Sequence, residues 1–193
     1  MSGRPRGFDD EAVIEAAMEV FWSNGYEATS AQDLVERTGL GRGSLYNAFG
    51  SKQGLYHEAL KRYQEQALQA QLEILGGPGS LKERLRNLML WGLESDLDPV
   101  KRRGCMALFA VLERASKDPE VAQISRLYAN RLEQALCHAF AVGQRNGEVT
   151  AAAPPLSLAR AFQGSYYGLR VLGRSVQDRA VLLDVIESTL ALF

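Results

Sequence analysis

Apolar residues recur at intervals of three and four positions along nearly the whole chain, which is the spacing of one face of an α-helix. Val13, Ala17 and Phe21 follow it near the N-terminus, and Leu158 and Phe162 follow it near the C-terminus. The residue types agree, because 27 Leu and 24 Ala, which favour helices, outnumber 12 Val and 4 Ile, which favour strands. No stretch alternates between apolar and polar residues as a half-buried strand does. The sequence therefore predicts an all-α protein.

Hydrophobicity and charge narrow the class of protein further. The 193 residues are 46% hydrophobic, enough for a globular core, and the formal net charge of −1 argues against a uniformly basic nucleic-acid coat. No apolar run approaches the roughly 18 residues that a membrane span needs, and the N-terminus lacks the apolar stretch of a signal peptide. The two cysteines are too few for a disulfide framework. We therefore expect a soluble, cytoplasmic protein.

Start and stop signals divide the helical pattern into about nine segments. Ser30 and Asp33 resemble a capping box with Asp in place of Glu, and Asp118 before Pro119 is a strong helix start. The clearest break is the run from Gly76 to Gly79. The other expected starts follow residues that can cap a helix or interrupt the pattern before it: Asp9 or Asp10, Gly41, Ser51, Pro99, Pro154 and Asp178.

Two of the short helices, joined by Thr38-Gly39-Leu40-Gly41, have the dimensions of a helix-turn-helix. In that motif the second helix lays its N-terminal residues in the major groove of DNA. Here the second helix would cover residues 41–49, with Leu45 and Phe49 turned toward the core. An Arg-Gly-Ser turn between two short helices also occurs as a plain connection. A helical hairpin without a role in DNA binding is therefore the alternative at this point.

The outward residues of this second helix suit contact with DNA. Arg42 offers a bidentate pair of donors for guanine, and Asn47 can pair with adenine. Gly43 lets the backbone approach the duplex, and Ser44 faces the same way. The Tyr46 hydroxyl suits phosphate oxygens, which position a protein without conveying sequence.

Further contacts with phosphate are expected around this helix. Lys52 carries a suitable charge, and Thr29 or Ser30 offers a hydroxyl and backbone N–H groups at a helix N-terminus. Arg4 and Arg6 would form either a flexible arm that enters the adjacent minor groove or a solvated tail. Residues 1–63 hold seven basic and nine acidic residues. We therefore expect a focused set of contacts and a moderate dependence on salt, not a broad basic face.

The stretch from Phe21 to Tyr56 reads FWSNGYEATSAQDLVERTGLGRGSLYNAFGSKQGLY and closely resembles the N-terminal domain of TetR-family transcriptional regulators. The matching elements are Phe21, Gly25-Tyr26, Thr29-Ser30, the run from Ala31 to Gly39, the run from Gly43 to Tyr46, Phe49, Ser51-Lys52 and Leu55. Two positions depart from the family. Many relatives have Ser or Ala where this chain has Gly41, and His where it has Ala48. Base specificity therefore cannot be carried over from a relative.

The resemblance implies two domains and a two-fold dimer. Residues 1–54 would form the helix-turn-helix domain and residues 55–193 a ligand-binding and dimerisation domain, joined by the fourth helix. Two helices from each chain would form a four-helix bundle, and the operator would be pseudo-palindromic. The residues expected at the dimer interface are Gly164, Gly168, Leu169, Leu172, Leu182, Val185, Ile186 and Leu190. For each of these residues, a place in the chain's own core is the alternative.

By the same resemblance, the C-terminal domain binds a small effector, which the sequence does not identify. Its pocket would combine aromatic walls with a few polar groups. The candidates are Trp91, Cys105, Met106, Phe109, Leu112, Tyr128, Phe140, Phe162, Tyr166 and Tyr167. Ordinary core packing is the alternative for each of them. We expect no cofactor and no metal.

Cys105 has a second interpretation. It follows the basic run from Lys101 to Arg103 at an expected helix start, where the helix dipole and nearby cations favour a reactive thiolate. The resemblance adds that some relatives sense electrophiles or oxidants through a cysteine in a similar segment. The alternative is a small buried apolar residue.

Catalysis is not expected, because His57 and His138 are the only near-neutral bases and neither lies in a triad or metal-binding pattern. The chain also has no P-loop and no dinucleotide fingerprint. We expect a ligand-responsive regulator that binds its operator as a homodimer and is released by a small molecule. Repression is favoured, because this compact chain shows no extra segment for recruiting polymerase. The alternatives are a repressor that senses electrophiles through Cys105, and a helical small-molecule-binding protein without a role on DNA.

Overall fold

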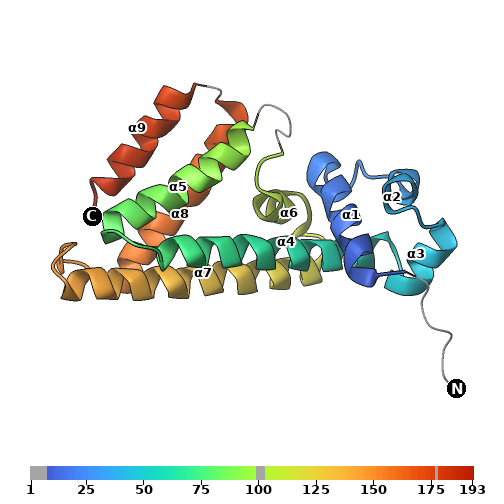
Figure 1. Cartoon of the computed structure of the whole chain (residues 1–193), viewed down its shortest axis with the longest axis horizontal. Helices are drawn as coiled ribbons and strands as arrows, with labels where there is room; N and C mark the ends of the chain where they lie inside the picture. The colour runs from blue at the N-terminus through green and yellow to red at the C-terminus, as the bar shows by residue number, and fades with distance from the viewer. Residues whose placement is uncertain (1–7, 99–102, 177) are drawn as a thin grey trace, which may run out of the picture.

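The computed structural model describes residues 8–98, 103–176 and 178–193. Within these residues the chain forms nine helices and no strand (Figure 1). The helices are α1 (Asp10–Asn24), α2 (Ala31–Thr38), α3 (Arg42–Phe49), α4 (Lys52–Leu75), α5 (Leu81–Leu97), α6 (Met106–Arg114), α7 (Pro119–Arg145), α8 (Pro155–Ser175) and α9 (Arg179–Leu190). The predictions of an all-α chain and of about nine helices are confirmed.

The predicted helix starts are largely the observed ones. At six of the nine described helices, a side chain at the start accepts backbone N–H groups that have no partner in the helix. Ser30 and Asp33 form a reciprocal capping box: Ser30 Oγ accepts from the Asp33 N–H, and the Asp33 carboxylate accepts from the Ser30 N–H. Asp118 caps α7, with Pro119 at its first position. The same kind of cap is made by Asp9, Ser51, Ser80 and Asp178.

The N-terminal unit consists of α1, α2, α3 and the first turns of α4, gathered at one end of the molecule (Figure 1). Phe21, Leu34 and Leu45 are each at most 1% exposed. Phe21 also meets Tyr56 edge to face, with 4.9 Å between the ring centroids. Leu45 is buried as predicted, and Phe49 packs half-buried against the same core. Because these two residues hold one side of α3 inward, the opposite side faces outward.

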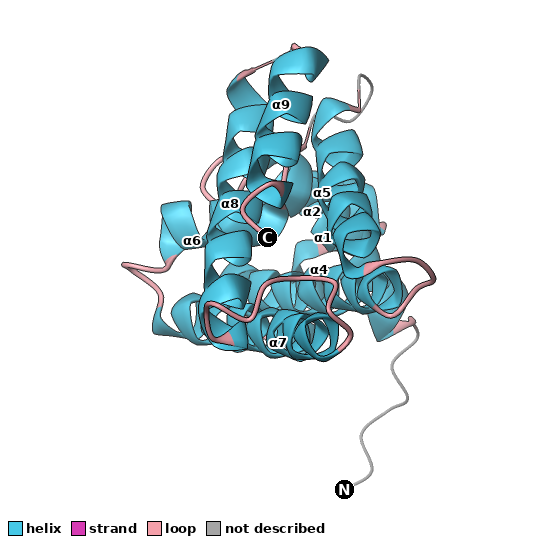
Figure 2. Ribbon diagram, turned by 90° about the vertical axis from the view of Figure 1, so that its left-hand side faces the viewer, coloured by secondary structure: helices cyan, strands magenta, loops and turns pink. Residues whose placement is uncertain are grey.

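The continuous helix α4 belongs to both ends of the molecule. It packs on α1 and α3 of the N-terminal unit and also on α5, α6 and α7. In Figure 1, α4 and α7 run side by side along the lower face. Figure 2 looks along this pair from the end opposite the N-terminal unit, with α5, α8 and α9 above it. A movement of α4 would therefore be felt by the helix-turn-helix and by the C-terminal core.

The dimer interface expected from the sequence needs correction. Leu169, Leu182, Ile186 and Leu190 are at most 3% exposed, because they pack into the core that α8 and α9 share with α5. These four leucine and isoleucine side chains cannot contact a second chain, so that prediction is wrong for them. The other predicted interface residues stay accessible: Gly164, Gly168 and Leu172 are exposed, and Val185 is half-buried.

Two predicted pocket residues are also core residues. Phe140 and Phe162 are both fully buried. They pack against Phe193 with tilted rings, and the ring centroids are 5.0 Å and 6.2 Å apart. Their rings therefore fill the core beside the end of the chain, and Phe162 also stacks on Tyr166. A place for these two residues in an effector pocket stays a prediction.

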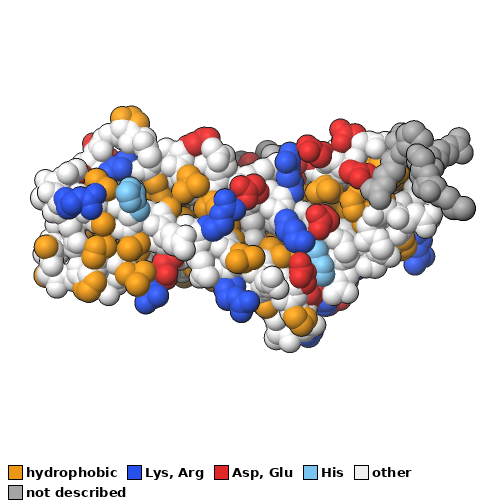
Figure 3. All heavy atoms as spheres, turned by 90° about the horizontal axis from the view of Figure 1, so that it is seen from below, with side chains coloured by type: hydrophobic (Ala, Val, Ile, Leu, Met, Phe, Trp, Pro, Cys, Tyr) orange, Lys and Arg blue, Asp and Glu red, His pale blue; other side chains and the backbone are white. Residues whose placement is uncertain are grey.

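The face that α4 and α7 present from below mixes both signs of charge (Figure 3). Acidic and basic side chains alternate along its middle, and apolar side chains gather toward the end away from the N-terminal unit. Among the described residues, no helix combines the length and apolar character needed to cross a bilayer. In the same part of the chain, no three His, Cys, Asp or Glu side chains group to hold a metal ion.

Candidate functional site

The outward side of α3 carries polar groups without internal partners. Arg42, Gly43, Ser44 and Asn47 are exposed, and Tyr46 is half-buried. Within the described residues, the side chains of Arg42, Ser44 and Asn47 make no hydrogen bond or ion pair. The Arg42 guanidinium lies over the Tyr46 ring, 5.5 Å from its centroid. A Cβ added to Gly43 would meet nothing within 4 Å. This face therefore keeps its donors and acceptors for another molecule.

Two predicted phosphate contacts turn inward and need correction. Thr29 is 1% exposed, and its hydroxyl donates to the Gly25 carbonyl at 2.6 Å. The Lys52 ammonium donates to the backbone carbonyls of Tyr26 and Thr29, at 2.9 and 2.7 Å. Both side chains brace the α1–α2 loop, so the prediction that they contact phosphate is wrong.

The remaining predicted DNA contacts around α3 are those of Ser30, Arg4 and Arg6. Ser30 is exposed at the N-terminus of α2, where its oxygen accepts from the Asp33 N–H. Arg4 and Arg6 lie outside the described residues.

The α1–α2 loop is also held by α6. The two oxygens of the Glu113 carboxylate accept backbone N–H bonds, from Tyr26 at 3.0 Å and from Glu27 at 2.9 Å. Arg114 pairs with Glu27 at 2.7 Å. Gly25 has φ +78°, and a Cβ there would lie 3.4 Å from both Glu113 oxygens. Glycine at this position therefore serves the turn and the approach of the carboxylate together.

Cationic side chains from two different helices lie over the Tyr26 ring. Lys52 Nζ of α4 lies 4.3 Å from the ring centroid, and the Arg114 guanidinium carbon of α6 lies 4.2 Å from it. A cation over an aromatic face is attracted by the ring, by about 0.5–2 kcal/mol depending on exposure. Tyr26 thus joins the helix-turn-helix to both α4 and α6.

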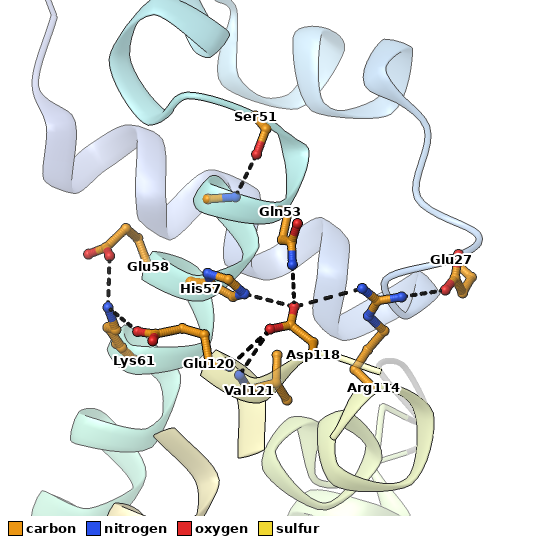
Figure 4. A network of polar contacts seen from close by, with 11 residues as sticks. Glu27, Ser51, Gln53, His57, Glu58, Lys61, Arg114, Asp118, Glu120 and Val121 are labelled. Atoms are coloured by element: carbon orange, nitrogen blue, oxygen red, sulfur yellow. Dashed lines mark hydrogen bonds and ion pairs between the residues drawn. The ribbon is translucent and has the colours of Figure 1, made fainter. Parts of the chain in front are cut away.

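Asp118, at the start of α7, connects α7 to the start of α4 (Figure 4). The buried carboxylate accepts from His57 Nε2 at 2.9 Å and from Gln53 Nε2 at 2.8 Å, and Arg114 lies 3.7 Å away. Burial raises the pKa of Asp118, but hydrogen bonds from His57, Gln53 and the Val121 N–H together outweigh it and lower the pKa to about 2. At neutral pH the buried Asp118 carboxylate is therefore ionised, and His57 and Gln53 both bind it.

Comparison with known proteins assigns the family. Residues 13–59 match the model of bacterial regulatory proteins of the tetR family. The chain is 33% identical over 190 residues to the HTH-type transcriptional regulator YezE of Bacillus subtilis, covering 98% of both chains. It is 51% identical over 61 residues to the HTH-type transcriptional repressor ComR of Escherichia coli, covering 32% of this chain and 29% of ComR. The TetR family transcriptional regulator CifR, solved with operator DNA, superimposes with a TM-score of 0.84 at 30% identity over 98% of both chains.

The chain belongs to the TetR family. It is a transcriptional regulator of that family, with α2 and α3 as its helix-turn-helix. The resemblance that the sequence showed between Phe21 and Tyr56 is confirmed and extends over the whole fold.

The C-terminal domain of this TetR-family protein contains a buried polar cluster. Tyr128 donates to Gln71 Oε1 at 2.9 Å, and Gln71 Nε2 donates to the Tyr166 hydroxyl at 3.5 Å. Arg170 donates to the same hydroxyl at 3.3 Å and makes a bidentate pair with Asp96, at 2.5 and 2.8 Å. Burial raises the pKa of Tyr128 and that of Tyr166, so both phenols stay protonated at neutral pH. Four helices, α4, α5, α7 and α8, meet in this cluster.

Cys105 lies between this cluster and the DNA-binding unit. Its buried thiol is within electrostatic reach of Tyr63, Tyr128 and Tyr166. The neighbouring Gly104 carbonyl accepts from the Trp22 indole N–H of α1 at 2.7 Å. Of the predicted pocket residues, Cys105, Tyr128 and Tyr166 therefore come together.

Four other predicted pocket residues lie elsewhere, whereas Tyr167 lies beside Tyr166, with 6.1 Å between the ring centroids. Met106, Phe109 and Leu112 face a separate pocket between α6 and α1. Trp91 is half-buried on α5 and packs against the core. Tyr167 is half-buried, and its hydroxyl accepts from Gln163 Nε2 at 2.8 Å.

Several functional residues were missed from the sequence. Arg170 follows Tyr166 by four positions on the buried face of α8, and a charge at that spacing could have signalled a buried ion pair. Glu113 gave no local signal, because its partners lie 86 and 87 positions away in the sequence. Asp118 was recognised only as a helix cap, although it also binds α4.

Proposed function

We propose that the protein is a repressor that binds a pseudo-palindromic operator as a homodimer, with residues 1–54 as the DNA-binding unit. The observation that carries this proposal is the outward face of α3, whose polar side chains have no internal partner while its apolar side chains are buried. CifR, solved with a 26 bp double-strand operator DNA, and ComR, named a repressor, support it.

Each exposed side chain of α3 has a role in this proposal. Arg42 donates to guanine O6 and N7, and Asn47 pairs with adenine in the major groove. Tyr46, Ser44 and Ser30 contact phosphates and set the register. Arg4 and Arg6 reach the adjacent minor groove. A protein with this function acts in the cytoplasm, where the bacterial chromosome lies.

The dimer forms through the outer face of α8 and α9. A Cβ added to Gly164 or Gly168 would meet nothing within 4 Å, so a partner helix can approach closely there. Val171 and Leu172 on α8 and Val181 on α9 are exposed apolar side chains on the same two helices. Helices packed in pairs across a two-fold axis place the two copies of α3 about 34–36 Å apart, or a multiple of it, to match turns of the duplex.

A small effector in the C-terminal domain releases the protein from DNA. Gln64 of α4 is buried, and its amide nitrogen has no hydrogen-bond partner among the described residues. Gln64 and Tyr128 both line a pocket of about 360 Å³ between α4 and α7. Tyr128 also belongs to the buried polar cluster, where it donates to Gln71. An unpaired buried donor costs about 1–3 kcal/mol, so an effector with a hydrogen-bond acceptor gains by binding there. Because α4 packs on α3, a displacement of α4 by the effector would also move the helix-turn-helix.

An electrophoretic shift assay on the DNA upstream of the protein's own gene tests the proposal. Wild type should shift the DNA, and Arg42→Ala and Tyr46→Ala should each weaken binding at least ten-fold. Arg62→Ala is the matched control, because Arg62 is exposed on α4, away from the proposed dimer face, and pairs with Glu15. Equal affinity of all four proteins would overturn the assignment of α3.

A specific observation favours a second candidate, a repressor that senses electrophiles through Cys105. The thiol borders the buried cluster, and the preceding residues, Arg103 and Gly104, contact Glu19 and Trp22 of α1. A group attached to Cys105 would therefore displace the segment that touches the DNA-binding unit. In this proposal, Cys105→Ser should bind the operator but no longer respond to N-ethylmaleimide. Cys137→Ser should respond as wild type does, and a retained response in Cys105→Ser would exclude the sensor.

A further inference from the structure

A pocket of about 390 Å³ lies where α1 of the DNA-binding unit faces α6 of the C-terminal domain. It is separate from the buried polar cluster, and its walls come from both domains. Its apolar walls are Phe21, Trp22 and Tyr56 on one side and Met106, Phe109 and Leu112 on the other. Small-molecule sites are commonly of this size and are lined by aromatic and aliphatic side chains with a few polar groups.

The charged groups in the wall differ in what they already bind. Arg103 is paired with Glu19. The Glu113 carboxylate accepts the two backbone N–H groups of the α1–α2 loop. Arg174 pairs with no carboxylate in the part of the chain that the structure describes. Arg174 is therefore the one charged side chain of the described wall that makes no hydrogen bond or ion pair.

The aromatic ring next to this cation is fixed in place. The Arg174 guanidinium lies 5.7 Å from the centroid of the Phe109 ring. Gly104 has φ +68°, and a Cβ at that position would lie 2.5 Å from the Phe109 ring, so the ring packs directly on the backbone. Phe109 and Arg174 together present a rigid apolar surface beside an anion-binding group.

We propose that this interdomain pocket is a second ligand site, which takes a small amphipathic carboxylate. The acid group pairs with Arg174, and the apolar part packs between Trp22 and Phe109. A neutral apolar molecule would leave the Arg174 charge uncompensated, and an amine would be repelled by it. Because Trp22 belongs to α1 and Phe109 to α6, the bound ligand holds the two domains in the arrangement seen here.

Titration with 3-phenylpropanoate tests the site in Trp91→Phe protein, where Trp22 is the only tryptophan. The acid should change Trp22 fluorescence saturably, and 3-phenylpropan-1-ol, of the same length without the charge, should bind at least ten-fold more weakly. Adding Arg174→Gln should raise the Kd for the acid at least ten-fold and leave that for the alcohol unchanged. Arg160→Gln, on the same helix, should leave both unchanged.

Two results would overturn the proposal. One is the absence of a saturable change in Trp22 fluorescence up to 10 mM acid, in protein whose circular dichroism and operator binding are normal. The other is binding of the acid that Arg174→Gln leaves intact, which would place the ligand elsewhere. The operator shift, measured on the same preparation, separates these results from a failure of the proposed DNA binding.

Discussion

The α3 helix and the junction of α6 with α7 are both polar, but they use their side chains in opposite ways. Arg42, Ser44 and Asn47 of α3 make no hydrogen bond or ion pair with the described residues. At the junction, Glu113 and Asp118 each accept at least two hydrogen bonds from other elements. Free polar groups mark a surface for another molecule, whereas satisfied ones mark a joint that sets the geometry of the fold. In the proposed function, the contrast separates the part that would read DNA from the part that would position it.

The largest expected effect is the loss of Asp118. Asp118→Ala removes the cap of α7 and leaves His57, Gln53 and Arg114 without their shared partner, so the free energy of unfolding should fall by about 3–5 kcal/mol. Asp178→Ala, which removes an exposed cap with one backbone bond, should cost about 1 kcal/mol or less. Urea unfolding of both variants measures the difference. Equal losses of unfolding free energy would show that the Asp118 contacts stabilise the fold no more than an exposed helix cap does. The contrast drawn with α3 would then be wrong.

Acid should weaken the same junction. The pKa of Asp118 is lowered in the folded state to about 2, from 3.8 in the unfolded chain. Its charge therefore contributes its full stability above about pH 4, and this is lost as the pH falls toward 2. The difference in unfolding free energy between wild type and Asp118→Asn should narrow as the pH falls from about 4 toward 2. A difference that stays constant down to pH 2 would contradict the stated role of the carboxylate.

Substitution of Glu113 tests the junction separately, because Glu113 binds the α1–α2 loop and, among the described residues, makes no hydrogen bond or ion pair with α3. In Glu113→Ala, the backbone N–H groups of Tyr26 and Glu27 lose their acceptor, and their amide hydrogen exchange should rise about ten-fold, equivalent to roughly 1.4 kcal/mol. Glu133→Ala, which removes only an exposed pair with Arg160, is the control. Unchanged exchange at residues 26 and 27 would mean that α6 does not hold the loop.

The smallest effect is expected at the start of α2. Ser30→Ala removes one half of the capping box and should lower the free energy of unfolding by about 1 kcal/mol. Ser44→Ala on α3, with no internal partner, should change it by less than about 0.5 kcal/mol. Thermal unfolding of the two variants gives the comparison. A larger loss in Ser44→Ala would show that the α3 side chain is internally engaged after all.

The sequence predicted helix boundaries well, because the signals for them are local. The Ser30–Asp33 capping box and the Asp118–Pro119 start lie within a few residues of the N–H groups they serve. Burial of Leu45 followed from its spacing in an amphipathic helix. These features depend on neighbours in the chain, and a sequence displays neighbours directly.

The errors arose where a distant partner decides the role of a side chain. Lys52 was expected on phosphate, but carbonyls 23 and 26 positions earlier bind its ammonium. Leu182 and Ile186 were expected at a dimer interface, because an apolar face looks the same whether it meets its own chain or another. Spacing alone shows that such a face is covered and does not show by what.

The most direct test of the central claim is the base preference of α3. Operator affinity should be measured for wild type, Arg42→Ala and Asn47→Ala against duplexes in which each base pair of the half-site is replaced in turn. We expect each variant to lose its preference at one symmetry-related pair of positions, worth about 1–3 kcal/mol per contact. Arg62→Ala, an exposed α4 residue paired with Glu15, should keep the wild-type profile. If Arg42→Ala and Asn47→Ala bind every duplex as wild type does, the outward face of α3 does not read DNA.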